Sequence, residues 1–153
     1  MMSRTSLVLS ALMVCGASLA AQSPLVGTWR VTYAAGARIE NGERTTIMAN
    51  ATLQIAGAGD SLVGTLANDP SADIPERPPL KLAGLAGKGA STLVSTSSGS
   101  LNMNGEQKAI TVISTWVLEV RGDSLVGTVA RKVEGVQLPE TGPADVRGTR
   151  KTG

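Results

Sequence analysis

The chain contains no histidine and no phenylalanine, and it has a single cysteine, Cys15. Without histidine, the sequence lacks the commonest general base and the commonest nitrogen ligand for metals. Without phenylalanine, two tryptophans and one tyrosine are the only aromatic side chains available for a core. A domain that begins after Cys15 has to fold without disulfides. These absences exclude much enzyme chemistry before any motif is considered.

Charged residues are also sparse, at 17% of the chain, and 14 basic against 12 acidic residues leave a net charge of +2. They are scattered along the sequence and form no basic stripe, so we expect no nucleic-acid partner. The length of 153 residues suits one domain, and 42% hydrophobic residues are enough for a folded core. Eighteen glycines and seven prolines favour strands and turns over helices.

The first twenty residues have the three-part pattern of a secretory signal peptide. Arg4 is followed by an apolar run from Leu7 to Ala20 that ends in small residues. This run is shorter than the roughly 20 apolar residues that span a bilayer, so we expect cleavage after Ala20 and no stable membrane span afterwards. Val14 precedes Cys15 where a lipoprotein signal has a small residue, which leaves lipidation weakly supported. The predicted organisation is a signal peptide at 1–20 and one domain at 21–153, periplasmic or secreted.

One heptapeptide occurs twice in the chain. Gly59-Asp60-Ser61-Leu62-Val63-Gly64-Thr65 returns unchanged at residues 122–128. Each copy lies between two alternating apolar segments, so Gly-Asp is interpreted as the turn of a β-hairpin. The copies reflect either a duplication of about four strands or repeated use of a good turn, and the dissimilar flanks favour the second.

Apolar and polar residues alternate along the predicted strands, which separates an inner from an outer face. The inner face of the first strand carries Gly27, Trp29, Val31 and Tyr33. The same period predicts strands in residues 47–55 and 108–121, and weaker ones in 62–67, 80–85, 91–97, 125–133 and 144–151. Proline-rich connections at 68–79 and 134–143 cannot be central strands. About eight strands predict an all-β fold with a single antiparallel up-and-down barrel; a β-sandwich is the alternative.

The two ends of the domain carry a resemblance to a known family. Gly27-Thr28-Trp29 resembles the Gly-x-Trp that begins the first strand of lipocalins and their calycin relatives. Gly148-Thr149-Arg150 resembles the closing strand of those barrels, in which an arginine packs over that tryptophan. The resemblance implies that Gly27, Trp29 and Arg150 close the barrel. A guanidinium over an indole contributes about 0.5 to 2 kcal/mol by cation–π attraction.

A lipocalin-like barrel implies a cup for a small apolar ligand. Inner positions that could line it include the small residues Ala49, Ala51 and Ser114, with Tyr33, Trp116 and Arg131 as aromatic or polar groups that could orient a ligand. A core filled by leucine, isoleucine and valine is the equal alternative, with inward glycines serving curvature. An inward Arg131 would need an anionic partner, and a bulge at Arg131-Lys132 that turns it outward is the favoured expectation.

Gly-Asp-Ser-Leu is also the signature string of a serine hydrolase family, but that chemistry needs an imidazole, which this chain lacks. No carboxylate pair is visibly buried and no Asp-x-Asp-x-Asp spacing occurs, so we predict no catalytic residues, no metal and no cofactor. The sequence favours an exported, non-enzymatic protein that binds a small hydrophobic or amphipathic ligand. The alternative is a structural or protein-interaction module with a filled core. Ligand identity and oligomeric state are left open.

Overall fold

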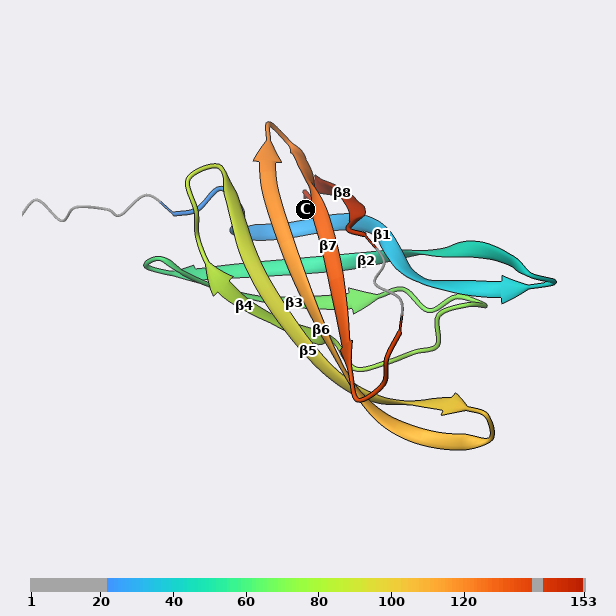
Figure 1. The fold of residues 1–153 in the computed structure, drawn as a ribbon. Helices are drawn as coiled ribbons and strands as arrows, with labels where there is room; N and C mark the ends of the chain where they lie inside the picture. The colour runs from blue at the N-terminus through green and yellow to red at the C-terminus, as the bar shows by residue number, and fades with distance from the viewer. Residues whose placement is uncertain (1–21, 139–141, 153) are drawn as a thin grey trace, which may run out of the picture.

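A computed structural model describes residues 22–138 and 142–152, so the predicted leader, with Cys15, lies outside the described residues. These residues form one closed antiparallel barrel in which each strand pairs with its neighbours in the chain and β8 returns to β1 (Figure 1). The predicted all-β up-and-down barrel of about eight strands is confirmed, in place of a sandwich. The strands are β1 (Gly27–Glu40), β2 (Glu43–Ala58), β3 (Ser61–Asn68), β4 (Leu80–Leu85), β5 (Ala90–Met103), β6 (Glu106–Arg121), β7 (Ser124–Glu134) and β8 (Ala144–Arg150).

Tight turns join the long strands. Gly59-Asp60 and Gly122-Asp123 are the predicted two-residue hairpin turns, with φ of 61° and 64° at the two glycines. A glycine with positive φ in the first central position suits the right-handed twist of the strands on either side. At the other end of the barrel, Asn41-Gly42 and Asn104-Gly105 turn with positive φ at both residues of each pair.

The barrel closes where the first strand meets the last. Trp29 pairs with Arg150 in the register of β1 with β8, and the guanidinium carbon lies 4.2 Å from the centroid of the buried indole. Arg150 also donates to the carbonyl oxygens of Val26, at 3.3 Å, and Pro24, at 3.0 Å. The indole Nε1 donates to the Leu25 carbonyl at 2.9 Å. The predicted contact of Arg150 with Trp29 is therefore confirmed, and residues 23–26 cover this closed end.

Gly27 has a steric reason to be glycine. Its φ is 140°, and a β-carbon there would lie 2.8 Å from an Arg150 guanidinium nitrogen. A side chain would therefore displace the arginine from the indole, which ties the predicted closure residues into one arrangement.

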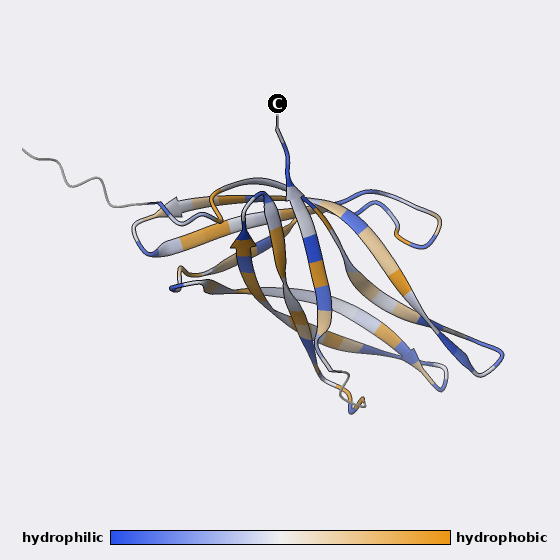
Figure 2. Cartoon of the chain, turned by 90° about the horizontal axis from the view of Figure 1, so that it is seen from above, coloured by the Kyte–Doolittle hydropathy of each residue, from blue (hydrophilic) through white to orange (hydrophobic). Residues whose placement is uncertain are grey.

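Period-two alternation positions the core as predicted, and hydrophobic and hydrophilic residues alternate along the strands (Figure 2). The interior is filled by Trp29 and by the side chains of large aliphatic residues that are almost fully buried: Leu53, Leu62, Leu66, Leu93, Leu118, Leu125, Val31, Val129 and Val146. The two proline-rich connections are loops, at 69–79 and, as far as it is described, around 135–143. No helix in the described ranges is long and apolar enough to span a lipid bilayer.

Unequal strand lengths make the two ends of the barrel different. β1–β2 and β5–β6 extend past the point where β4 and β8 stop pairing, and form two ribbons that project from the barrel (Figure 1). We call this the ribbon end, and it also carries the loop 69–79 and residues 135–138. The second strand was predicted to begin at residue 47 and the fifth to end at residue 97. Both predicted strands are too short, since β2 begins at Glu43 and β5 ends at Met103. Asn-Gly, a strong hairpin signal, marks the tip of each ribbon.

Inward glycines bring neighbouring strands close together. A β-carbon on Gly127 would overlap the carbonyl oxygen of Val117 and lie 3.0 Å from the Leu118 α-carbon. On Gly148, a β-carbon would lie 2.7 Å from the Arg30 carbonyl oxygen. These glycines allow the sheet to curl tightly, which is the curvature role that the sequence left open for Gly127.

This packing predicts different effects for two Gly→Ala substitutions within strands. Gly127→Ala should lower the free energy of unfolding by about 1–3 kcal/mol, because the added methyl group forces backbone apart. Gly99→Ala is the matched control, since its β-carbon would meet only Ile110, at 3.9 Å. It should change stability by less than about 1 kcal/mol. Urea denaturation measures both, and equal stability of the two variants would contradict the assigned role of Gly127.

Candidate functional site

The six predicted ligand-binding residues all lie on the inner face of the barrel, in the half nearer the ribbon end. In the register, Tyr33 is opposite Ala49, Val31 is opposite Ala51, and Ser114 is opposite Arg131. Tyr33, Ala49, Ala51, Ser114 and Trp116 are buried, and Arg131 is half-buried. The fold thus brings together residues from β1, β2, β6 and β7.

Two aromatic side chains form the centre of this cluster. The rings of Tyr33 and Trp116 meet edge to face, with centroids 5.2 Å apart and an interplanar angle of 68°. The Trp116 Nε1 donates to Ser95 Oγ at 3.2 Å, and the Tyr33 hydroxyl donates to Asn68 Oδ1 at 2.6 Å. Both polar atoms are therefore satisfied, and the two rings are held in fixed orientations.

Ser95 and Asn68 were missed by the sequence analysis. Ser95 lies in a segment where serine and threonine occur on both faces, so the period-two pattern has little contrast there. Asn68 is the last residue of β3, at the start of a connection that was interpreted only as a loop. The sequence does not indicate which hydroxyl group a polar residue at such a boundary will contact.

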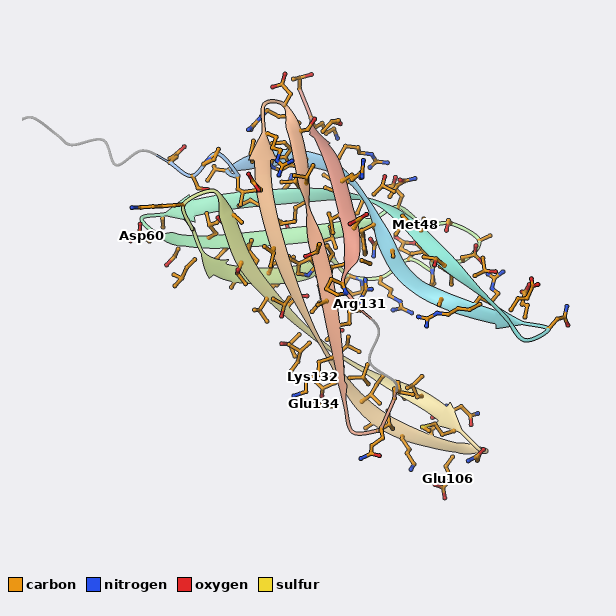
Figure 3. All side chains as sticks on the ribbon, turned by 45° about the horizontal axis from the view of Figure 1, so that its top comes forward. Met48, Asp60, Glu106, Arg131, Lys132 and Glu134 are labelled. Atoms are coloured by element: carbon orange, nitrogen blue, oxygen red, sulfur yellow. The ribbon has the colours of Figure 1, made fainter. Side chains whose placement is uncertain are left out.

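Arg131 points inward, contrary to the expected bulge. Strand β7 pairs with β6 in unbroken register through Arg131 and Lys132, so the alternation that places Val129 inside also places Arg131 inside. Its Nη2 donates to the Ala34 carbonyl at 2.7 Å, and its guanidinium carbon lies 5.9 Å from the Tyr33 ring centroid. Figure 3 shows Arg131 on β7, facing the neighbouring part of the barrel wall.

The contact between Arg131 and Ala34 crosses an opening in the ladder of the barrel. Pairing of β8 with β7 ends at Ala144 with Val129, and pairing of β8 with β1 ends at Val146 with Tyr33. Beyond these pairs β7 and β1 are neighbours with no strand between them. The arginine side chain supplies a hydrogen bond there in place of main-chain pairing.

The electrostatics of the cluster are set by burial. Burial lowers the pKa of Arg131, because a charged guanidinium is poorly solvated there, while the nearby Tyr33 acts in the opposite direction. Burial raises the pKa of the Tyr33 hydroxyl, and the hydrogen bond with Asn68 and the charge of Arg131 oppose that rise. Among the described residues, no carboxylate forms a salt bridge with Arg131.

The loop at 69–79 packs against the ribbon end. Ile74 from this loop is buried and belongs to the core cluster. Asp69 pairs with Arg30 through both carboxylate oxygens, and Asp73 pairs with Arg38 on the β1–β2 ribbon. The hydrogen bond from Arg30 lowers the pKa of Asp69; desolvation opposes this shift, and the positive charges of Arg30 and Lys151 add to it. These ion pairs fix the loop beside the cluster.

The surface has two marked hollows outside the cluster. One, of about 710 Å³, lies on the outer face over β2 to β5 and includes Ala56, Val63, Ala83 and Val94. The other, of about 540 Å³, lies beside the β5–β6 ribbon and is lined by Met103, Lys108 and residues 135–137. None of the six predicted ligand-binding residues lines either hollow. The predicted cavity around Ala49, Ala51, Ser114 and Trp116 stays a prediction.

Comparison of the chain with protein-family models, with curated proteins and with solved structures finds no match.

Tyr33 is the only tyrosine in the chain, so its ionisation can be followed directly by tyrosinate absorbance. The midpoint in the folded protein should lie above the ordinary value of 10.0 and return to it in urea. A group whose pKa is raised by folding stabilises the fold fully below its unfolded pKa and loses that effect as pH rises through the folded value. We therefore expect stability to fall above pH 10.

The variant Arg131→Met tests the geometry of this pair. Because the guanidinium charge opposes the rise in the pKa of Tyr33, its removal should move the midpoint further up. Arg147→Met, on the outer face of β8, should leave the midpoint unchanged. A midpoint that is the same in folded and unfolded protein would show that Tyr33 is solvated.

Proposed function

We propose that this protein is a lipocalin-like carrier that binds a small amphipathic molecule with an anionic headgroup at the ribbon end of its barrel. The family resemblance is supported by the closed eight-strand barrel and by the packing of Arg150 on Trp29. The observation that carries the ligand class is Arg131, an inward cation that forms no salt bridge with a described residue.

The chemistry of the headgroup follows from the surroundings of Arg131. A half-buried guanidinium has five N–H donors, and the described hydrogen bonds occupy one nitrogen with the Ala34 carbonyl. A carboxylate or a similar anion would accept the remaining donors and offset the cost of burying the charge. Tyr33 and Trp116 present apolar ring surface beside it, which suits the tail of an amphipathic molecule.

Both halves of the interior are filled by buried side chains, so a ligand at the ribbon end would have to move the side chains around Tyr33 and Trp116 apart. The barrel ladder is incomplete there, because β4 and β8 are short. Movement of the Arg131 side chain away from the Ala34 carbonyl would admit a headgroup between β7 and β1. The ligand would thus replace a hydrogen bond that the empty barrel makes with its own backbone.

Export and the lack of enzymatic activity belong to the same proposal. Export rests on the signal-peptide pattern of residues 1–20. The non-enzymatic assignment rests on the missing imidazole and on the absence of an evident nucleophile with a base.

A protein-interaction module with no ligand is the second candidate, and the outer face of the barrel favours it. Val63, Leu85, Val94 and Val117 are exposed apolar side chains on adjacent strands β3 to β6. Ala83 lies between Val63 and Val94 in the register, so the apolar surface is continuous across three strands. A continuous patch of exposed apolar side chains often marks a site of contact with another protein.

Native mass spectrometry of protein purified from its own compartment separates the two candidates. The carrier should retain a mass adduct, and a panel of fatty acids and other amphiphiles should change the tryptophan fluorescence of the wild-type protein, in which Trp116 lies beside Tyr33. The interaction module predicts a bare mass and unchanged fluorescence. An empty spectrum together with no response across the panel would overturn the carrier proposal.

Arg131→Met tests the role of the cation once a ligand is found. A fatty acid should bind at least about tenfold more weakly to this variant, because a charge-assisted hydrogen bond is worth roughly 1.5–3 kcal/mol. The corresponding fatty alcohol should bind both forms about equally, since it has no charge to lose. Arg147→Met, exposed on the outer face, is the matched control. Equal losses for acid and alcohol would assign Arg131 to barrel structure alone.

A further inference from the structure

The barrel leaves several strand edges without a neighbouring strand at its ribbon end. Pairing of β4 with β5 stops at Ala83 with Val94, so β5 has a free edge over residues 95–103, on the side away from β6. Other free edges follow from the same registers: residues 34–40 of β1, 43–50 of β2, 80–82 of β4, 106–110 of β6 and 130–134 of β7. The edge of β5 is the longest of these.

Charge distinguishes the edge of β5 from all the others. Each of the other free edges carries at least one charged side chain: Arg38 and Glu40, Glu43 and Arg44, Lys81, Glu106 and Lys108, and Arg131, Lys132 and Glu134. The edge of β5 has the sequence Ser-Thr-Ser-Ser-Gly-Ser-Leu-Asn-Met, with no charge and no proline. Charged residues and prolines are the usual means by which proteins prevent strand edges from pairing with other chains.

Geometry does not protect this edge either. β5 pairs with β6 in unbroken register from Ala90 to Met103, whereas the edge of β1 is interrupted by a shift between Ala34 and Gly36. Residues 96–100 are exposed. Apart from the ladder with β6, no backbone hydrogen bond within the described residues reaches residues 95–103. Alternate N–H and C=O groups of an antiparallel strand face away from its partner, so this edge presents free donors and acceptors.

We infer that the edge of β5 is the site at which two copies of this chain associate, by antiparallel pairing of β5 with β5 across a two-fold axis. A two-fold arrangement places each edge opposite itself in reverse order, so an edge without charged side chains brings no charge close to its own copy. This edge is neutral and its side chains are small. With the axis at Gly99, Ser98 lies opposite Ser100 of the partner subunit and Thr96 lies opposite Asn102 of the partner subunit, pairs that form cross-strand hydrogen bonds.

The position of the edge makes such pairing sterically accessible. The β5–β6 ribbon projects from the barrel, and its tip at Glu106 lies far from the Asp60 turn at the opposite end (Figures 1 and 3). A second ribbon can therefore approach this edge from outside the barrel. The dimer would contain a continuous sheet in the order β6, β5, β5, β6. The inference is independent of the proposed ligand, because Arg131 and the aromatic pair face the barrel interior.

Ser98→Lys tests the inference against a matched control, Thr92→Lys. Both residues are exposed on the outer face of β5, but Thr92 lies where β5 is paired on both sides, with Leu85 and Val117. Sedimentation equilibrium of the purified protein should show a concentration-dependent dimer for the wild type and for Thr92→Lys. Ser98→Lys should weaken dimerisation at least about tenfold, because it places two like charges in diagonal positions on either side of the axis.

Backbone amide exchange provides a second readout that does not depend on a variant. Alternate amides among residues 96–102 should become protected as the protein concentration rises, while amides of the β1–β2 ribbon tip at 40–43 should not change. A wild-type monomer at all concentrations up to about 1 mM would overturn the inference. A dimer that Ser98→Lys leaves intact would also overturn it, since the contact would then lie elsewhere. Thermal melting of both variants verifies that each is folded.

Discussion

The contact between Trp29 and Arg150 is the interaction on which the rest of this structure depends. An up-and-down sheet of eight strands has two edges until its first and last strands meet, and β1 meets β8 at this pair. The guanidinium covers the indole and at the same time binds the carbonyl groups of residues 24 and 26, so one side chain links the last strand, the first strand and the segment that covers the closed end. Gly27 leaves the space that this arrangement needs.

The unequal lengths of the strands divide the barrel into two functional halves. Where all eight strands pair, the interior is filled by leucine and valine side chains, which stabilise the fold. Beyond the ends of β4 and β8, side chains make contacts in place of the missing ladder: Arg131 donates a hydrogen bond to the Ala34 carbonyl, and Asp73 holds a loop to Arg38 of β1. Both the proposed ligand site and the inferred dimer contact belong to this less regular half.

Local patterns in the sequence predicted the parts of the fold that depend on local rules. Alternation placed Trp29, Tyr33 and Trp116 inside, and Gly59-Asp60 and Gly122-Asp123 were recognised as turns, because both signals involve residues near in sequence. Arg131 was expected to face outward, because burying a charge is costly. Nothing in the sequence indicated that the distant Ala34 carbonyl accepts a hydrogen bond from it. The ribbons were missed for a different reason: alternation is weak before their Asn-Gly turns, where β1 is rich in alanine and glycine and β5 is rich in serine.

Closure by residues so far apart has a kinetic consequence. The hydrogen bond from Arg150 to the Val26 carbonyl joins positions 124 residues apart in sequence, and every hairpin of the meander lies between them. The chain can form those hairpins in turn, but the ring stays open until the last strand joins the first, and folds dominated by such distant contacts are slow to form. Until that step the edge of β1 is unpaired and the inner apolar face is exposed to solvent.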